Sequence, residues 1–130
     1  MQTAVERVMN PHEYCQERAA SSGSSFYYSF LFLPEERRRA IIALYAFCRE
    51  VDDAVDETSD PSVARMKLTW WRTQIAAIYQ GSPQHPVAVA LADCVAPFRI
   101  SRGELEEIVD GMQMDLDRNR YENFEALRLY

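Results

Sequence analysis

Residues that start and stop α-helices recur along this chain, and they constrain its fold more than any other feature. The pairs Asn10-Pro11 and Asp60-Pro61 predict helix starts, because Asn and Asp cap the first turn and proline is pre-set for its first position. Ser101 with Glu104 forms a capping box that predicts another start. Gly81 predicts a helix end, because glycine adopts the left-handed conformation that follows a last turn. Only four glycines and six prolines interrupt 130 residues, which favours long helices.

We therefore predict an all-α chain that forms a single domain. The expected helices span about residues 11–20, 34–57, 61–81, 85–95 and 101–118, with a last helix from about 123. The stretch 21–25 is predicted to be a polar loop, followed by an aromatic segment. The last helix reaches Tyr130 without glycine, proline or a polar cap. We expect residues 1–130 to be a partial domain, the N-terminal part of a larger helical bundle.

Composition excludes several classes of function. Fourteen basic and twenty acidic side chains give a net charge of −6, and no basic run is present, so nucleic acid is not an expected partner. Cys15, Cys48 and Cys94 are odd in number and widely spaced, which indicates a reducing compartment and small core residues. The longest apolar run, 40–48, is about half of the ~20 residues that span a bilayer, and residues 1–10 show no secretory signal. We expect a cytoplasmic protein, soluble or peripheral to the inner membrane.

The segment 48–57, CREVDDAVDE, carries four carboxylates within its last six residues. At about 100° per residue, Asp52 and Asp56 fall inside or beside an apolar stripe of the same helix, whereas Asp53 and Glu57 point away. That stripe contains Ile41, Tyr45, Cys48 and Val55. We expect Asp52 and Asp56 to face the core as an i, i+4 pair.

Two inward carboxylates one turn apart repel each other unless a cation neutralises them. Arg49, which falls beside them, can do so alone. Mg²⁺ is the better fit, because it binds through one or two carboxylates and completes its octahedron with water and phosphate oxygens. Arg49 would then clamp the phosphate. This arrangement suits ionisation of an allylic diphosphate, in which a metal stabilises the departing pyrophosphate.

Two further features are ambiguous by themselves. The segment 110–117 carries Asp115 at the edge of an apolar stripe, and a stripe that includes methionine is more often core than binding site. The stripe consists of Leu105, Val109, Met112 and Leu116. The aromatic group 26–32 is by default core packing, although aromatic rings also stabilise a cation in a pocket.

Three segments together resemble the squalene/phytoene synthase family of head-to-head prenyltransferases. They are SSFYYSFLFLPEERRRAIIALYAFCR, CREVDDAVDE and DGMQMDLDRNRYENFEALRLY, and they occur in the family's order over nearly the whole chain. The resemblance implies the N-terminal half of a class I terpenoid-synthase-type helical bundle, with Mg²⁺ as cofactor. The family's second aspartate-rich motif does not occur in these 130 residues.

The resemblance also implies roles for individual residues. Asp52 and Asp56 match the aspartates that bind Mg²⁺ and diphosphate, and Arg49 matches a diphosphate-binding arginine. Tyr130 matches a tyrosine near the cyclopropyl and proton-handling steps. A flap over the diphosphate would contain Ser22, Ser24 and Ser25, although some members carry a basic residue where this chain has Ser24. The substrate-binding residues would include Phe26, Phe30, Tyr45, Met112 and Asp115.

The implied reaction joins two farnesyl diphosphates in 1′–1 fashion to presqualene diphosphate and releases pyrophosphate, as in the bacterial, hopanoid-making branch of the family. Phytoene synthesis from geranylgeranyl diphosphate is the nearest alternative, and a noncatalytic helical scaffold is an alternative of another class. We expect the 130 residues alone to be inactive and to self-associate through exposed helix faces. Those faces carry Tyr45, Cys48, Met112 and Leu127.

Overall fold

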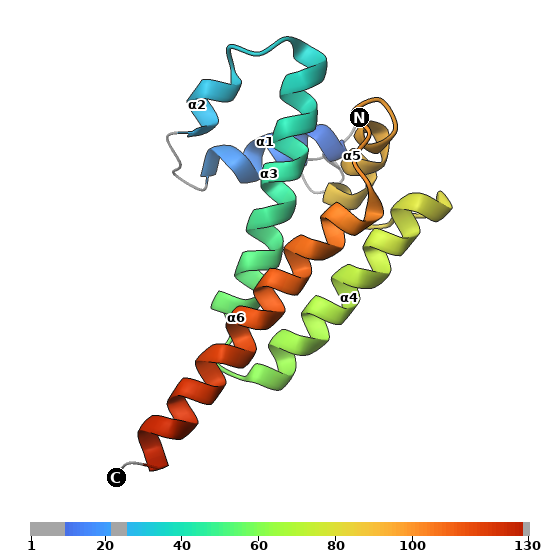
Figure 1. Cartoon of the computed structure of the whole chain (residues 1–130). Coiled ribbons are helices and arrows are strands. Elements are labelled where there is room, and N and C mark those ends of the chain that lie inside the picture. The colour runs from blue at the N-terminus through green and yellow to red at the C-terminus, as the bar shows by residue number, and fades with distance from the viewer. Residues whose placement is uncertain (1–9, 22–25, 129–130) are drawn as a thin grey trace, which may run out of the picture.

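The structure is a computed structural model that describes the backbone of residues 10–21 and 26–128 and the side chains of residues 10–21 and 27–118. The described residues form helices and connecting turns and no strand, which confirms the all-α prediction. The helices are α1 (Pro11–Ser21), α2 (Phe26–Phe30), α3 (Glu35–Asp56), α4 (Pro61–Gln80), α5 (Pro86–Val95) and α6 (Arg102–Arg128), as Figure 1 shows. None of the described helices is long and apolar enough to cross a bilayer.

The predicted caps form the expected contacts. The Asn10 side chain accepts a hydrogen bond from the Glu13 backbone N–H at 2.9 Å, and the Asp60 side chain accepts one from the Ser62 N–H at 2.9 Å. Gly81 ends α4 in the left-handed conformation, with φ of 85°. These local interactions explain why the helix starts could be predicted from the sequence.

One expectation about the helices was wrong, and one short helix was not predicted. The fifth and sixth expected helices form one continuous helix, α6, because no glycine or proline separates residues 118 and 123. Residues 26–30 form the short helix α2 within the aromatic segment. The stretch 22–25, predicted to be a loop, lies outside the described residues.

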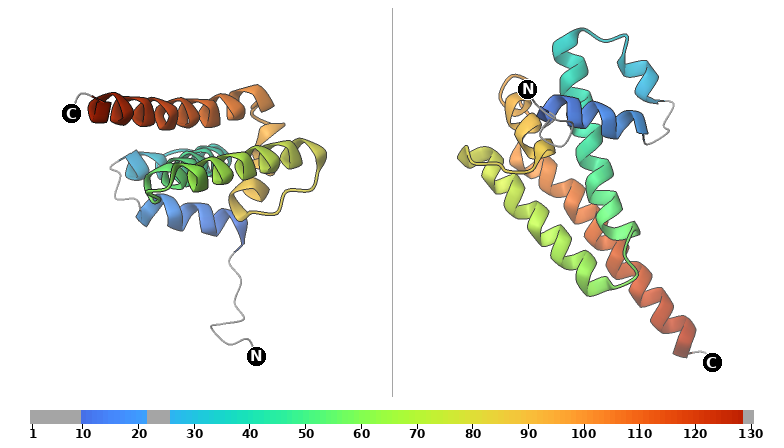
Figure 2. Two further views of the ribbon diagram at one scale, coloured as in Figure 1. Left: turned by 90° about the horizontal axis from the view of Figure 1, so that it is seen from below. Right: turned by 180° about the vertical axis from the view of Figure 1, so that it is seen from behind.

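The helices pack in three layers. Figure 2 shows α1 and α5 on one side, α3 and α4 in the middle, and α6 across the other side. The buried core lies between these layers, and its largest fully buried side chains include Phe47, Leu68, Ile75, Leu91 and Leu105. Helix α3 therefore has one side toward α1 and α5 and another side toward α6.

The core face of α3 packs against α1, α4 and α5 and differs from the predicted apolar stripe, so the prediction of the stripe as the core face was wrong. The fully buried residues Ala43, Phe47 and Val51 lie about 80–160° away from Ile41 on the helical wheel. Ile41 and the other members of the predicted stripe are only half-buried. Because residues 40–48 are apolar around the whole helix, the pattern alone did not identify the side that packs.

The cysteines only partly follow the prediction. Cys15 and Cys94 are buried among the helices, and all three cysteines are free thiols. Burial, with smaller effects from Cys94 and Glu50, raises the pKa of the Cys15 thiol to about 12, so it stays neutral. Cys48 lies half-buried on the side of α3 away from the core, so its assignment to the core was wrong.

Candidate functional site

A pair of carboxylates lies at the C-terminal end of α3, on the side toward α6. Partial burial and then the negative charge of Asp56 raise the pKa of Asp52, and Asp115 of α6 adds to the shift. Arg49 opposes it, with its Nη1 3.4 Å from Asp52 Oδ2. Asp52, Asp56 and Asp115 therefore share one electrostatic environment in which negative charge exceeds the compensation from Arg49. The proximity of Asp52, Asp56 and Arg49 was predicted correctly, but the pair lies on the half-buried side of α3, with Asp56 exposed, and does not face the core.

The chemistry of these donors fits a hard divalent cation. Among the described residues, no three acidic, histidine or cysteine side chains stand close enough to form a complete metal site. Mg²⁺ does not need one, because it takes one or two carboxylates and obtains its other oxygens from water and phosphate groups. Asp52 and Asp56 are the side chains that would hold such an ion.

Asp53 contradicts the prediction that it points away from the protein. Its side chain is 13% exposed, compared with 33% for Asp52, because it lies on the side of α3 that packs against α1. One carboxylate oxygen pairs with Arg18 of α1, and the other lies 3.3 Å from Arg49 Nη2. Arg49 therefore lies between Asp52 and Asp53. Glu57 is exposed, as predicted.

The polar contacts of α1 with α3 were not predicted from the sequence. The Tyr14 hydroxyl donates a hydrogen bond to Glu50 Oε1 at 2.8 Å, and Arg18 Nε lies 3.2 Å from the same oxygen. Burial and the hydrogen bond to Glu50 raise the pKa of Tyr14 to about 12. The spacing of Tyr14 and Arg18 puts them on one face of α1, which is a usable signal, but their partners become identifiable only when α1 is packed on α3.

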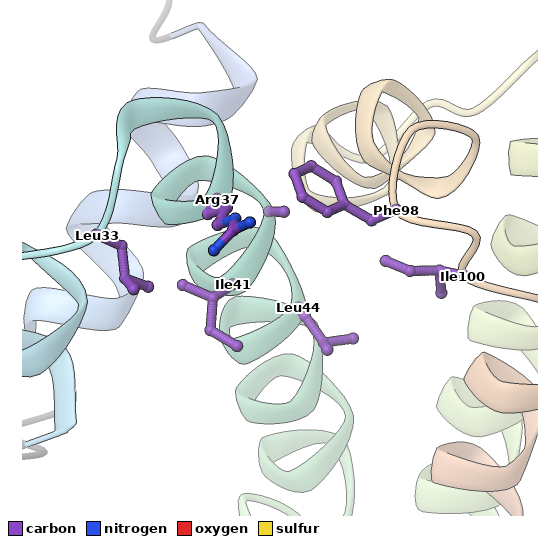
Figure 3. A pocket seen from close by; sticks show the side chains of 7 residues that line it. Leu33, Arg37, Ile41, Leu44, Phe98 and Ile100 are labelled. Atoms are coloured by element: carbon purple, nitrogen blue, oxygen red, sulfur yellow. The ribbon is translucent and has the colours of Figure 1, made fainter.

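An apolar region continues from the carboxylates toward the N-terminal end of α3. The Phe30 and Tyr45 rings, both predicted to line a pocket, meet edge to face with centroids 5.8 Å apart. Beyond them lies a cavity of about 320 Å³ between α3 and the connection from α5 to α6 (Figure 3). Its lining is Leu33, Arg37, Ala40, Ile41, Leu44, Phe98 and Ile100. The half-buried side of α3 thus carries acidic groups at one end and an apolar cavity at the other.

Helix α6 also contributes to this side. Leu105, Val109 and Leu116 of its predicted apolar stripe are buried, and Met112 packs half-buried against them, so the stripe is confirmed as core. Asp115 is exposed at the edge of the stripe.

Several predicted site residues lie outside the described side chains. They are Ser22, Ser24, Ser25, Phe26 and Tyr130.

The raised pKa of Asp52 predicts a gain in stability when its charge is removed. A carboxyl with a raised pKa binds its proton more tightly in the folded state, so ionisation costs stability as the pH rises above the ordinary value of 3.8. We expect Asp52→Asn to stabilise the chain at pH 7 by about 0.2–0.5 kcal/mol, the usual size of an i, i+4 charge repulsion. This advantage should shrink as the pH falls below 3.8. Urea denaturation at several pH values measures it.

The exposed Glu57 supplies the control for that experiment. Glu57→Gln removes a negative charge from the same helix end and should change stability less than Asp52→Asn does. A loss of stability for Asp52→Asn at pH 7 would contradict the electrostatic assignment, because it would mean that the pairing with Arg49 outweighs burial and the charge of Asp56.

The architecture is that of the helical terpenoid-synthase class. The fold resembles the crystal structure of squalene synthase HpnC from Alicyclobacillus acidocaldarius, with a TM-score of 0.70 and 24% sequence identity over 81% of this chain and 39% of that one. The model of the squalene/phytoene synthase family matches residues 19–130. The chain therefore belongs to the squalene/phytoene synthase family, whose members are prenyltransferases that act on prenyl diphosphates.

Curated relatives of this chain are phytoene synthases. The chain is 35% identical to phytoene synthase of Arthrospira platensis over all 130 residues, and 34% identical to 15-cis-phytoene synthase of Synechocystis over 95% of the chain. It is also 34% identical to the chloroplastic phytoene synthase 1 of Arabidopsis thaliana over 92% of the chain. The chain spans 42%, 36% and 28% of the lengths of these three proteins, respectively.

Proposed function

We propose that the protein to which this chain belongs condenses two prenyl diphosphates head to head and releases pyrophosphate. The observation that carries this proposal is the arrangement along the half-buried side of α3. Leu44, at the apolar cavity, precedes Asp52 by eight residues, which is about 12 Å along a helix. An amphipathic substrate with an anionic head and a hydrocarbon tail matches this arrangement.

Each group has a role in this proposal. Arg49 donates hydrogen bonds to the substrate diphosphate, and Asp52 and Asp56 face it from the next turns of α3. A divalent metal ion, when bound, would offset the negative charge that collects on the departing pyrophosphate. The diphosphate leaves with the electron pair of its C–O bond, and the resulting allylic cation is attacked by a double bond of the second substrate, after which a proton is lost. In this proposal the rings of Tyr45 and Phe30, which contact each other, stabilise the cation.

The substrate proposed first is farnesyl diphosphate, and the product is then presqualene diphosphate, a precursor in hopanoid and squalene synthesis. The alternative is geranylgeranyl diphosphate, which yields phytoene, and the phytoene synthase relatives favour it. The two tails differ by one isoprene unit, so the depth of the apolar cavity decides between them. The predicted cytoplasmic or membrane-peripheral location stays a prediction.

Product analysis tests the proposal. An enzyme that contains this chain would be incubated with Mg²⁺ and radiolabelled farnesyl or geranylgeranyl diphosphate, with EDTA as the control. We expect presqualene diphosphate from farnesyl diphosphate, and phytoene would support the alternative. No condensation with either substrate would contradict the proposed function and favour a scaffold. The 130-residue chain alone, which lacks a second aspartate-rich motif, is expected to form neither product.

A further inference from the structure

Arg18 connects α1 to the diphosphate-binding side of α3 through two charged residues. Its guanidinium pairs with Asp53, and its Nε lies 3.2 Å from Glu50 Oε1. Both carboxylates are largely buried, with 13% and 16% of their side chains exposed. Burying two neighbouring carboxylates lowers the stability of the fold unless a cation neutralises their charge. Arg18 supplies that cation from a different helix.

Asp53 links Arg18 to Arg49, because it contacts both arginines. One oxygen of Asp53 pairs with Arg18, and the other lies 3.3 Å from Arg49 Nη2, while Arg49 Nη1 lies 3.4 Å from Asp52. Arg49 is thus held between the carboxylates of two consecutive residues of α3. Its Nε is buried and has no hydrogen-bond partner among the described residues. The side chain as a whole is 38% exposed, so it is accessible to an anionic ligand.

We propose that Arg18 is a positioning residue that keeps Arg49 available to the substrate diphosphate. With Arg18 in place, the charges of Asp53 and Glu50 are compensated from α1, and Arg49 can share its guanidinium with an anion beside Asp52. Without Arg18, Asp53 and Glu50 are two buried carboxylates that draw Arg49 toward themselves. The affinity for diphosphate then falls although Arg18 never touches it. This inference rests on the proposed function of Arg49.

A double-mutant cycle separates this role from simple anchoring of α1. The variants are Arg18→Gln, Arg49→Gln and their combination, and the measurement is calorimetric binding of inorganic pyrophosphate, in the presence of Mg²⁺, to an enzyme that contains this chain. We expect Arg18→Gln alone to weaken binding about tenfold, the low end for residues that orient a ligand-binding group. In the Arg49→Gln background the same change should have an effect below about twofold. Equal effects in both backgrounds would overturn the proposal. Arg18→Lys, which keeps the charge, should recover part of the affinity.

Nuclear magnetic resonance of the Arg49 Nε–H group tests the positioning directly. Arg18→Gln should shift or broaden this signal. Tyr14→Phe is the matched control, because it removes the other polar contact of α1 with Glu50 and leaves Asp53 paired. It should lower stability with little effect on the Arg49 signal. An unchanged Arg49 signal in Arg18→Gln, or the same change in both variants, would overturn the proposal.

The two measurements distinguish failure of this inference from failure of the proposed function. If the unchanged enzyme does not bind pyrophosphate, the result counts against the proposed role of Arg49 in diphosphate binding. The comparison of the Arg49 Nε–H signal between Arg18→Gln and Tyr14→Phe needs no ligand, so it still decides whether Arg18 positions Arg49.

Discussion

Replacing Asp52 or Asp56 by asparagine in an active enzyme that contains this chain is expected to lower kcat by a factor of about 10² or more, as loss of a group that stabilises developing charge commonly does. Asparagine keeps the shape of the side chain and removes the charge that a divalent cation and its diphosphate require. Steady-state kinetics with saturating Mg²⁺ measure the effect. The fold should survive, because both side chains lie outside the core.

Neighbouring residues of α3 supply the controls for this prediction. Glu57→Gln removes an exposed carboxylate and should leave turnover within about twofold, as surface changes away from a site usually do. Asp53→Asn should have an intermediate effect, because Asp53 contacts Arg49 and does not face the diphosphate in this proposal. Equal losses for Asp52→Asn, Asp56→Asn and Asp53→Asn would contradict the assignment of Asp52 and Asp56 as the metal-binding pair.

Replacing Phe47 by alanine is expected to destabilise the 130-residue chain by about 3–5 kcal/mol, the usual cost of this change in a packed core. Phe47 is fully buried, and its ring meets Trp71 of α4 edge to face with the ring centroids 5.7 Å apart. The loss is comparable to the whole stability of many domains, about 5–15 kcal/mol. Urea denaturation followed by circular dichroism measures it.

Phe32 allows the same substitution at an exposed position. Its side chain is 90% exposed after α2, so Phe32→Ala should change stability by less than about 0.5 kcal/mol. A loss below about 1 kcal/mol for Phe47→Ala would show that the side of α3 that carries Phe47 is not the core face. The predicted self-association through Tyr45, Cys48, Met112 and Leu127 is a separate question that light scattering can answer, and it stays a prediction.

The sequence by itself determined the helices and the family. Capping residues such as Asn10, Asp60 and Gly81 act on backbone groups within a few residues, so their effect does not depend on the rest of the fold. The acidic segment 48–57 likewise brings Asp52, Asp56 and Arg49 together, because residues three, four and seven apart meet on one side of any helix.

The tertiary structure alone decided which side of α3 packs and which charges meet across helices. Residues 40–48 are apolar around the whole helix, so only the packing of the neighbouring helices, including Trp71 of α4 against Phe47, buried Phe47 and left Ile41 half-buried. Gln74 shows the same dependence, because its buried side-chain oxygen accepts hydrogen bonds from the backbone N–H groups of Gln84 and His85 after α4.

The pairing of Arg18 with Asp53 is the clearest case. The two residues lie 35 positions apart, and their charges meet only because α1 lies along α3. The energy of such a pair depends on distance and on the exclusion of water, and both are properties of the packed structure. Local periodicity therefore predicted the acidic pair, whereas the pairing through which we infer that Arg18 positions Arg49 became visible only in the assembled fold.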